Sequence, residues 1–266
     1  MESVVLQNVS IGYIAKGHQR VVACGINGAI RSGELTCLLG RNGVGKSTLL
    51  RTLSAFQPVL SGEVLLATDS VRAPQYESLT ALNDRQLSRI IGVVLTERPH
   101  VRNMTVEEMV SMGRAPYTDF WGRLTDEDQQ VVDEAIRLTN IEPLRRRMMQ
   151  TLSDGERQKV MIAKALAQQT PVILLDEPTA FLDFPSKVEM MQLLHRLATT
   201  EQKTIFLSTH DVELALQLSD CIWLMETDGL HVGTPKELAL QGALSRFVEQ
   251  DGIHFDTNTL TIHITR

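Results

Sequence analysis

Residues 40–47 have the spacing of a phosphate-binding loop. They read GRNGVGKS and match the pattern GxxxxGK[ST], directly after a short apolar strand and before a helical run from Thr48 to Leu53. Glycines let backbone N–H groups turn toward phosphates at the start of a helix, where Lys46 reaches the β and γ phosphates and the Ser47 hydroxyl binds Mg²⁺. The alternative is a glycine turn with an incidental lysine, and the flanking strand and helix argue against it.

A second group of chemically useful residues ends an apolar strand. Residues 172–175 are followed by Asp176, Glu177 and Pro178. Beside a phosphate loop, Asp176 can orient the Mg²⁺ shell, and Glu177 can act as the general base for an attacking water. Without that loop, an apolar strand ending in two acids before proline also makes an ordinary turn.

Residues 152–158 read LSDGERQ and open a helix about twenty residues before the acidic strand. The segment resembles the signature of the ABC ATPases, with Asp154 where that family usually has glycine. Ser153 and the N–H groups after Gly155 form a helix N-terminus that can face a γ phosphate bound by the opposite subunit. A capped helix without a ligand is the alternative, because Ser153 and Glu156 also satisfy a capping box.

The resemblance extends from residue 6 to about residue 238 and implies further roles. Tyr13 stands where the family places an aromatic ring against adenine. Asp183 belongs to the loop that crosses the dimer interface, and His210 is the expected γ phosphate contact. Two copies are expected to sandwich two ATP molecules with Mg²⁺. Each ATP is held by the signature of one copy and by the phosphate loop of the other, whose contacts are Gly40, Asn42, Gly43, Gly45, Lys46, Ser47 and Thr48.

One family position departs from the usual pattern. After the strand at residues 90–94, most members carry a glutamine that links Mg²⁺ to the membrane-facing helical subdomain. Thr96 stands at that point, with Glu97 beside it. Mg²⁺ accepts hydroxyl oxygens and commonly keeps several waters, so Thr96 is the expected ligand through a bridging water. Glu97 is the competing candidate, although its charge would add to that of Asp176 and Glu177.

Short strands alternate with helical patterns, which is typical of parallel strands joined by crossover helices. The expected fold is α/β: a P-loop NTPase core of the ABC ATPase type, with an antiparallel β subdomain and an inserted helical subdomain. Expected strands of the core lie at 35–39, 90–94, 172–175 and 204–207, those of the β subdomain at 4–13, 21–22 and 62–68, and helices at 106–112, 126–138 and from 153 onward. A terminal hairpin is expected at 253–256 and 259–263, turning at 257–258.

These expectations organise residues 1–266 as one domain. Residues 1–97 and 168–242 form the nucleotide-binding core with its β subdomain, 98–167 the helical subdomain with the signature, and 243–266 a C-terminal helix and hairpin. His254 and His263 are expected to be exposed strand residues rather than metal ligands.

Cysteine spacing, net charge and apolar runs limit which compartment and which partners we expect. The three cysteines are far apart and lack CxxC spacing, so we expect small core residues in a reducing cytoplasm rather than disulfides or a zinc site. A net charge of −6 gives no attraction to nucleic acid, and the arginines at 145–147 are expected to be a solvated helix end. The start of the chain lacks a secretory signal, and no apolar run is long enough to span a bilayer.

Residues 112–117, 121–124 and 126–128 look like those of bacterial importer ATPases for iron siderophores, haem and cobalamin, with iron chelate the favoured cargo. The resemblance implies a peripheral subunit at the cytoplasmic face of the inner membrane. Its partners are a second ATPase copy, two multispan permease subunits and, indirectly, a substrate-binding protein. A cytosolic ABC scaffold, such as an iron–sulfur assembly ATPase, is the alternative. A DNA-repair ATPase of the coiled-coil type would need long heptad arms, which the sequence lacks.

Overall fold

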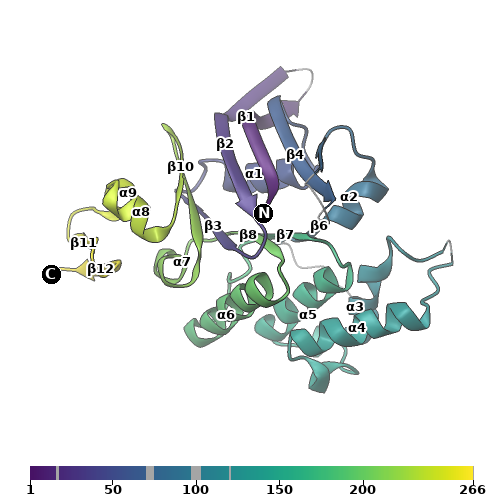
Figure 1. Cartoon of the computed structure of the whole chain (residues 1–266). Coiled ribbons are helices and arrows are strands. Elements are labelled where there is room, and N and C mark those ends of the chain that lie inside the picture. Colours follow the sequence, from purple (N-terminus) through teal and green to yellow (C-terminus); the bar gives the residue numbers. More distant parts are fainter. Residues whose placement is uncertain (16–17, 70–74, 97–102, 120, 266) are drawn as a thin grey trace.

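A computed structural model describes residues 1–15, 18–69, 75–96, 103–119 and 121–265 (Figure 1). Its centre is a six-stranded sheet in the order β10-β9-β3-β8-β7-β6. Neighbouring strands from β9 to β6 run parallel, and β10 is an antiparallel edge strand. The strands are β3 (Leu35–Gly40), β6 (Ile91–Val94), β7 (Val172–Asp176), β8 (Thr204–Ser208), β9 (Cys221–Glu226) and β10 (Gly229–Gly233).

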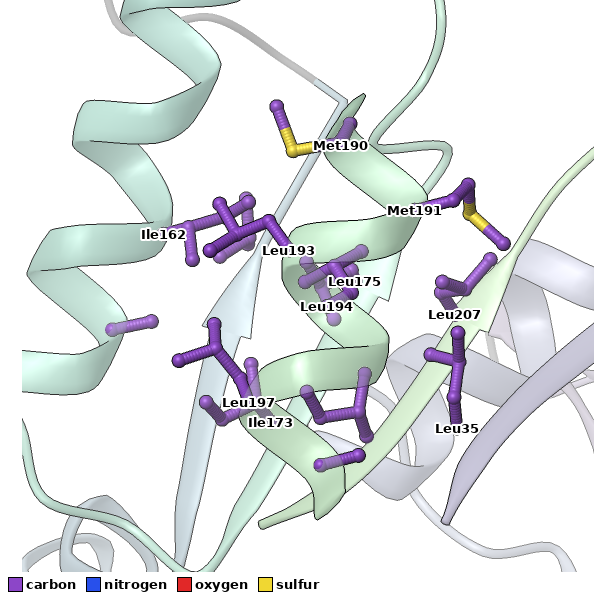
Figure 2. Close-up of a cluster of buried hydrophobic side chains, with 14 of the residues drawn as sticks. Leu35, Ile162, Ile173, Leu175, Met190, Met191, Leu193, Leu194, Leu197 and Leu207 are labelled. Atoms are coloured by element: carbon purple, nitrogen blue, oxygen red, sulfur yellow. The ribbon is translucent and has the colours of Figure 1, made fainter. Parts of the chain in front are cut away.

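The central strands are buried on both faces, and their side chains alternate between two cores. Leu174, Phe206 and Trp223 face the core that contains α1 (Lys46–Leu53), whereas Leu175 and Leu207 face α6 (Phe184–Thr200) and α5 (Asp154–Ala167). Figure 2 shows the second core, where leucines of α6 pack over β7 and β8 beside Ile162 of α5. The sheet therefore lies between the core around α1 on one face and the core formed with α5 and α6 on the other.

An antiparallel sheet in the order β2-β1-β4-β5 covers the other side of α1 (Figure 1). Its strands are β1 (Glu2–Ala15), β2 (His18–Arg31), β4 (Ser61–Asp69) and β5 (Gln75–Ser78). The expected antiparallel strands are thus present. The segment expected at 21–22 is far longer, however, because β2 follows β1 along nearly its whole length through several register shifts.

The helical region consists of α3 (Val106–Ser111), α4 (Asp126–Leu138) and α5, which lie together below the large sheet (Figure 1). Thr105, Thr125 and Ser153 cap these helices, each in a capping box. Short 3₁₀ turns lie at Met112–Arg114, Glu142–Leu144 and Met149–Thr151, and α2 (Asp84–Ile90) precedes β6. The arginines at 145–147 are not simply a solvated helix end, since Arg145 pairs with Glu107 and Asp133.

Helix α7 (Val212–Leu218) lies between β8 and β9. After β10 come α8 (Pro235–Leu240), α9 (Ala243–Val248) and the hairpin of β11 (Ile253–Asp256) and β12 (Thr261–Ile264). The hairpin and its exposed His254 and His263 agree with expectation, but the two-residue turn was wrong. Asp256 accepts hydrogen bonds from the backbone N–H groups of Asn258 and Thr259, so a four-residue turn separates the strands.

All three cysteines are free. Cys37 and Cys221 are buried, as expected, and burial raises the pKa of the Cys37 thiol to about 12. Cys24 is exposed on β2, so the expectation of a core residue was wrong there. None of the described helices is long and apolar enough to cross a membrane.

Candidate functional site

The phosphate loop joins the end of β3 to the start of α1, as the motif requires. Gly40 fits because a Cβ there would lie 2.4 Å from the carbonyl oxygen of Met225. Gly43, at φ +80°, has no described atom within 4 Å of a Cβ position, and Asn42 beside it is exposed. Gly45 precedes the helix at φ +121°. The loop is thus packed on its inner side and open on its outer side, which is the side that a ligand can approach.

Lys46 is the buried cation of this loop, with only 6% of its surface exposed. Its Nζ donates to the carbonyl oxygens of Gly40 at 2.7 Å and Arg41 at 3.3 Å. Burial lowers the pKa of Lys46, and the carboxylates of Glu177 and Asp176 oppose that shift. The ammonium group of Lys46 is therefore held inside its own loop near two acids. A bound anion could replace the backbone carbonyls as its hydrogen-bond acceptor, because an anion makes a stronger, charge-assisted bond.

Tyr13 reaches from β1 to the first turn of α1. Its hydroxyl and that of Thr48 share a hydrogen bond of 2.9 Å, and the residue remains 41% exposed. This bond fixes the ring beside the phosphate loop while leaving ring surface for a flat ligand. The sequence pointed to both residues, but it gave no sign that they contact each other.

Asp176 lies at the end of β7, separated from the phosphate loop by β8. Its Oδ1 accepts a hydrogen bond from Ser208 Oγ at 2.7 Å and lies 3.5 Å from Ser47 Oγ. Thr96 donates its hydroxyl to the main-chain oxygen of Asp176 at 2.8 Å, so it ties the end of β6 to the end of β7. Ser47, Asp176 and Thr96 thus meet at one sheet edge, and Glu97 lies outside the described residues.

Glu177 follows Asp176 in a left-handed backbone conformation, with φ at 48°. Its Oε1 lies 2.6 Å from Nε2 of His210, and its backbone N–H donates to Ser208 Oγ at 3.0 Å. Ser208 therefore binds both acidic residues from the neighbouring strand. Sequence reasoning missed this role, although the position of Ser208 two residues before His210 was a usable signal.

A second network, which sequence reasoning also missed, surrounds the residue after His210. Asp211 accepts hydrogen bonds from Thr179 Oγ1 and from Lys187 Nζ, both at 2.9 Å. Thr179 follows the acidic pair, and Lys187 belongs to α6. This network links the loop after β7, the loop after β8 and the first turns of α6.

The remaining predicted residues meet elsewhere. Ser153, Gly155 and Asp183 line one pocket of about 350 Å³ between the starts of α5 and α6. Ser153 caps α5 and Asp183 caps α6. No phosphate-loop residue is among the described residues that line this pocket. One chain thus contains two separate candidate half-sites, each with a helix N-terminus that can attract an anion.

Asp154 turns toward its own helix. Its Oδ1 lies 3.3 Å from Nη1 of Arg157, one helical turn further on. That cation offsets the negative charge that the departure from glycine adds at the start of α5.

A parallel sheet with a phosphate loop after β3 and an acidic pair after β7 defines a P-loop nucleotide-binding protein. Comparisons with known proteins narrow this class. The family model for ABC transporters matches residues 24–180. The chain is 42% identical to an uncharacterized ABC transporter ATP-binding protein of Methanocaldococcus jannaschii, over 83% of this chain and 72% of the relative.

Two further relatives have import functions in their names. The petrobactin import ATP-binding protein of Bacillus anthracis is 34% identical, over 86% of this chain and 82% of the relative. The iron(3+)-hydroxamate import ATP-binding protein of Bacillus subtilis is 32% identical, over 94% and 89%. A solved dimeric ATP-binding cassette with bound ADP and phosphate matches with a TM-score of 0.70 at 26% identity, covering 87% of this chain and 98% of that one.

The chain belongs to the ABC transporter family. It is the ATP-binding and ATP-hydrolysing subunit of a transporter, with the fold of an ABC ATPase cassette.

Proposed function

We propose that two copies of this chain bind two ATP molecules between them and energise an importer for an iron chelate. The observation that carries the proposal is the division of the site into two half-sites within one chain. The phosphate loop, Asp176 and Glu177 lie at the carboxyl ends of the strands, whereas Ser153 and Gly155 line a separate pocket. A second copy in head-to-tail orientation supplies the missing half to each.

The ATP half-site fits the nucleotide residue by residue. Tyr13 offers its exposed ring to adenine, and Gly40, Asn42, Gly43 and Gly45 shape the loop around the phosphates. Lys46, Ser47 and Thr48 then begin α1, where backbone N–H groups favour anions. On the opposite side of the nucleotide, the partner contributes Ser153, Gly155 and Asp183.

The oxygen donors fit Mg²⁺. The hydroxyl of Ser47 and a carboxylate oxygen of Asp176 are 3.5 Å apart, and Mg²⁺ prefers such hard oxygen ligands together with water. When bound, Mg²⁺ offsets the negative charge of the β and γ phosphates. Thr96 already donates its hydroxyl to the main chain of Asp176, so a bridging water is the route by which it would reach the ion.

Hydrolysis needs a base near the γ phosphate, and Glu177 is suited to that role. Its carboxylate takes the proton of the attacking water, so that ATP and water give ADP and phosphate. His210, whose Nε2 lies 2.6 Å from the Glu177 carboxylate, can hold that carboxylate in place and is the proposed γ phosphate contact. Ser208 fixes the backbone of Glu177 from β8.

Iron-chelate import is supported by the relatives that import petrobactin and iron(3+)-hydroxamate and by the segments at 112–117, 121–124 and 126–128. The partners are two multispan permease subunits, which place the ATPase pair peripherally on the cytoplasmic face of the membrane, and a substrate-binding protein that acts through them. A cytosolic scaffold is not favoured, because these relatives are import proteins.

The test is uptake in a strain that lacks this chain's gene and has no redundant system. Uptake of labelled ferric hydroxamate should be lost in the deletion, restored by the wild-type gene and not restored by Glu177→Gln. Labelled haem and cobalamin serve as the comparison cargoes. Normal uptake of all three compounds in the deletion would refute import while leaving the ATPase assignment intact, and selective loss of haem or cobalamin would replace the proposed cargo.

A further inference from the structure

Outside the nucleotide site, three possible metal ligands gather on the hairpin of β9 and β10. Glu226 ends β9, Asp228 lies in the turn, and His231 lies in β10. The Nε2 atom of His231 is 3.7 Å from Oε2 of Glu226 and 4.0 Å from Oδ1 of Asp228. One ligand atom from each of the three residues lies within 4.8 Å of the others.

The strand register explains why these side chains converge on an open space. Glu226 pairs directly with Gly229, and His231 follows two residues later, so both project from the same face of the hairpin. The position between them is glycine. A Cβ at Gly229 would have no described atom within 4 Å, so the face is unfilled where the two ligands meet.

The imidazole supplies an independent observation. The His231 side chain is 30% exposed, but its Nε2 atom is buried and has no hydrogen-bond partner among the residues that the structure describes. A buried polar atom without a hydrogen bond is costly, because it has lost water and gained no hydrogen bond in return. This atom instead points at two carboxylates that are too far away for a hydrogen bond.

We propose that Glu226, Asp228 and His231 bind one divalent transition-metal ion of the Zn²⁺, Fe²⁺ or Mn²⁺ class. One imidazole nitrogen and two carboxylate oxygens are ligands that such ions accept. Ligand atoms at about 2.0–2.2 Å from a shared ion lie about 3.0–3.6 Å apart, so the observed distances close by side-chain movements of under about 1 Å. Mg²⁺ is disfavoured because it prefers an all-oxygen shell.

The ion would act on the phosphate loop through the next residue along the chain. Met225 precedes Glu226, and its carbonyl oxygen and side chain pack against Gly40 and Gly45. Glu226 also lines a pocket together with Gly43 and Val44. A metal that fixes the hairpin thereby braces the inner side of the loop, at a place distinct from the Mg²⁺ site beside Ser47.

The experiment is a calorimetric titration of the full, nucleotide-free chain, stripped with a chelator, with ZnCl₂ and with MnCl₂. We expect one ion per chain at this site, and at least about a tenfold loss of affinity in His231→Gln and in Asp228→Asn. Asp228 is a largely exposed turn residue, so Asp228→Asn tests the site without threatening the fold. Thermal unfolding of the metal-free variants checks that they remain folded.

The matched control removes other histidines. His254 and His263 face each other across β11 and β12 and could bind an ion without the proposed site. The double variant His254→Gln, His263→Gln should therefore keep the high-affinity site. The proposal is overturned if the wild type binds neither ion, if His231→Gln and Asp228→Asn leave affinity unchanged, or if an equal concentration of Mg²⁺ displaces the bound ion.

Discussion

Glu177 combines two features that set it apart from the other acids that the structure describes. It has a left-handed backbone, and its carboxylate contacts His210 at 2.6 Å. A left-handed conformation in a residue other than glycine costs free energy, and the bond from its N–H to Ser208 helps to hold it. The backbone strain and the carboxylate position are thus parts of one local arrangement.

The first prediction concerns that carboxylate. Glu177→Gln keeps the size of the side chain but removes its basicity, so we expect ATP hydrolysis to fall by about a hundredfold or more while ATP binding persists. Phosphate release and equilibrium binding of a fluorescent ATP analogue measure the two effects. Glu213→Gln, an exposed substitution at the start of α7, is the control and should hydrolyse ATP normally. Near-normal turnover in Glu177→Gln would remove Glu177 from the role of base.

Thr96 gives the second prediction, because its hydroxyl connects two strand ends. Thr96→Val removes the hydrogen bond to Asp176 with little change in shape, and the loss of about 1 kcal/mol corresponds to about a fivefold fall in the permease-stimulated ATPase rate. Thr96→Ser retains the hydroxyl and should retain the rate. Both are measured in the purified full transporter with loaded binding protein. Unchanged rates in Thr96→Val, together with loss of activity in Glu97→Gln, would move the role to Glu97.

Motifs could be read from the sequence, but the contacts between them could not. The phosphate loop and the acidic pair each predicted a Mg²⁺ contact, Ser47 and Asp176, and these two side chains lie 3.5 Å apart. No local pattern could show that Thr179 and Lys187 bind Asp211, since these bonds depend on how three loops pack. Nor could it show that Cys24 lies on the outside of β2.

At the scale of elements, one carboxylate helps to fix the start of α4. Asp128 accepts hydrogen bonds from the backbone N–H and hydroxyl of Thr125, and Arg114 donates to it from its buried guanidinium. These hydrogen bonds hold the pKa of Asp128 below its ordinary value. The bond from the Thr125 N–H has the largest effect, those from Arg114 and the Thr125 hydroxyl add to it, and burial acts in the opposite direction. The cap of α4 and the anchoring of the turn at Arg114 therefore depend on one carboxylate.

The third prediction follows from the direction of that shift. A carboxylate with a lowered pKa in the folded state stabilises the fold above its unfolded pKa, and this contribution is lost as the pH falls through the folded value. Asp128→Asn should lower the free energy of unfolding by about 2 kcal/mol between pH 7 and pH 5. The difference from wild type should shrink below about pH 4.

Urea unfolding at several pH values makes this measurement. Asp133→Asn on the same helix is the control, because Asp133 is half exposed and its ion pair with Arg145 should contribute less than about 1 kcal/mol. A gap between Asp128→Asn and wild type that stays constant down to pH 3 would contradict the assignment.

The expected core strands and α4 are present, whereas the full length of β2 was not predicted. Helix α4 begins and ends at the expected residues because a capping box and an acidic first turn fix its start. By contrast, β2 mixes polar residues and glycines, and its full length follows its pairing with β1. Helix α6 was missed, although Asp183 followed by a proline two residues later was a signal for its start.

At the scale of the whole molecule, the two proposed half-sites lie on different elements, so one chain cannot complete a site by itself. The phosphate loop lies on the six-stranded sheet, whereas the signature pocket lies between α5 and α6. Exposed Phe181 lines that pocket, and exposed Phe184 directly follows Asp183 in the chain, with 76% and 65% of their surfaces accessible in one chain. A second copy would cover these rings while completing the site.

The last prediction tests that pairing through charge. Gly155 lies in the first turn of α5, where an added carboxylate suits the helix dipole, and a Cβ there meets only Leu182 and Ser186 at ordinary contact distances. Gly155→Glu should therefore fold normally, yet its charge would face the γ phosphate held by the partner. In the Glu177→Gln background, in which ATP should hold the closed pair, Gly155→Glu should abolish ATP-dependent dimerisation while each chain still binds ATP at its own loop. Sedimentation velocity with and without ATP reports the state, and Gly155→Ala, which adds volume without charge, should still dimerise. If Gly155→Glu dimerised at the ATP concentrations that dimerise the Glu177→Gln parent, the signature helix would not approach the partner's nucleotide.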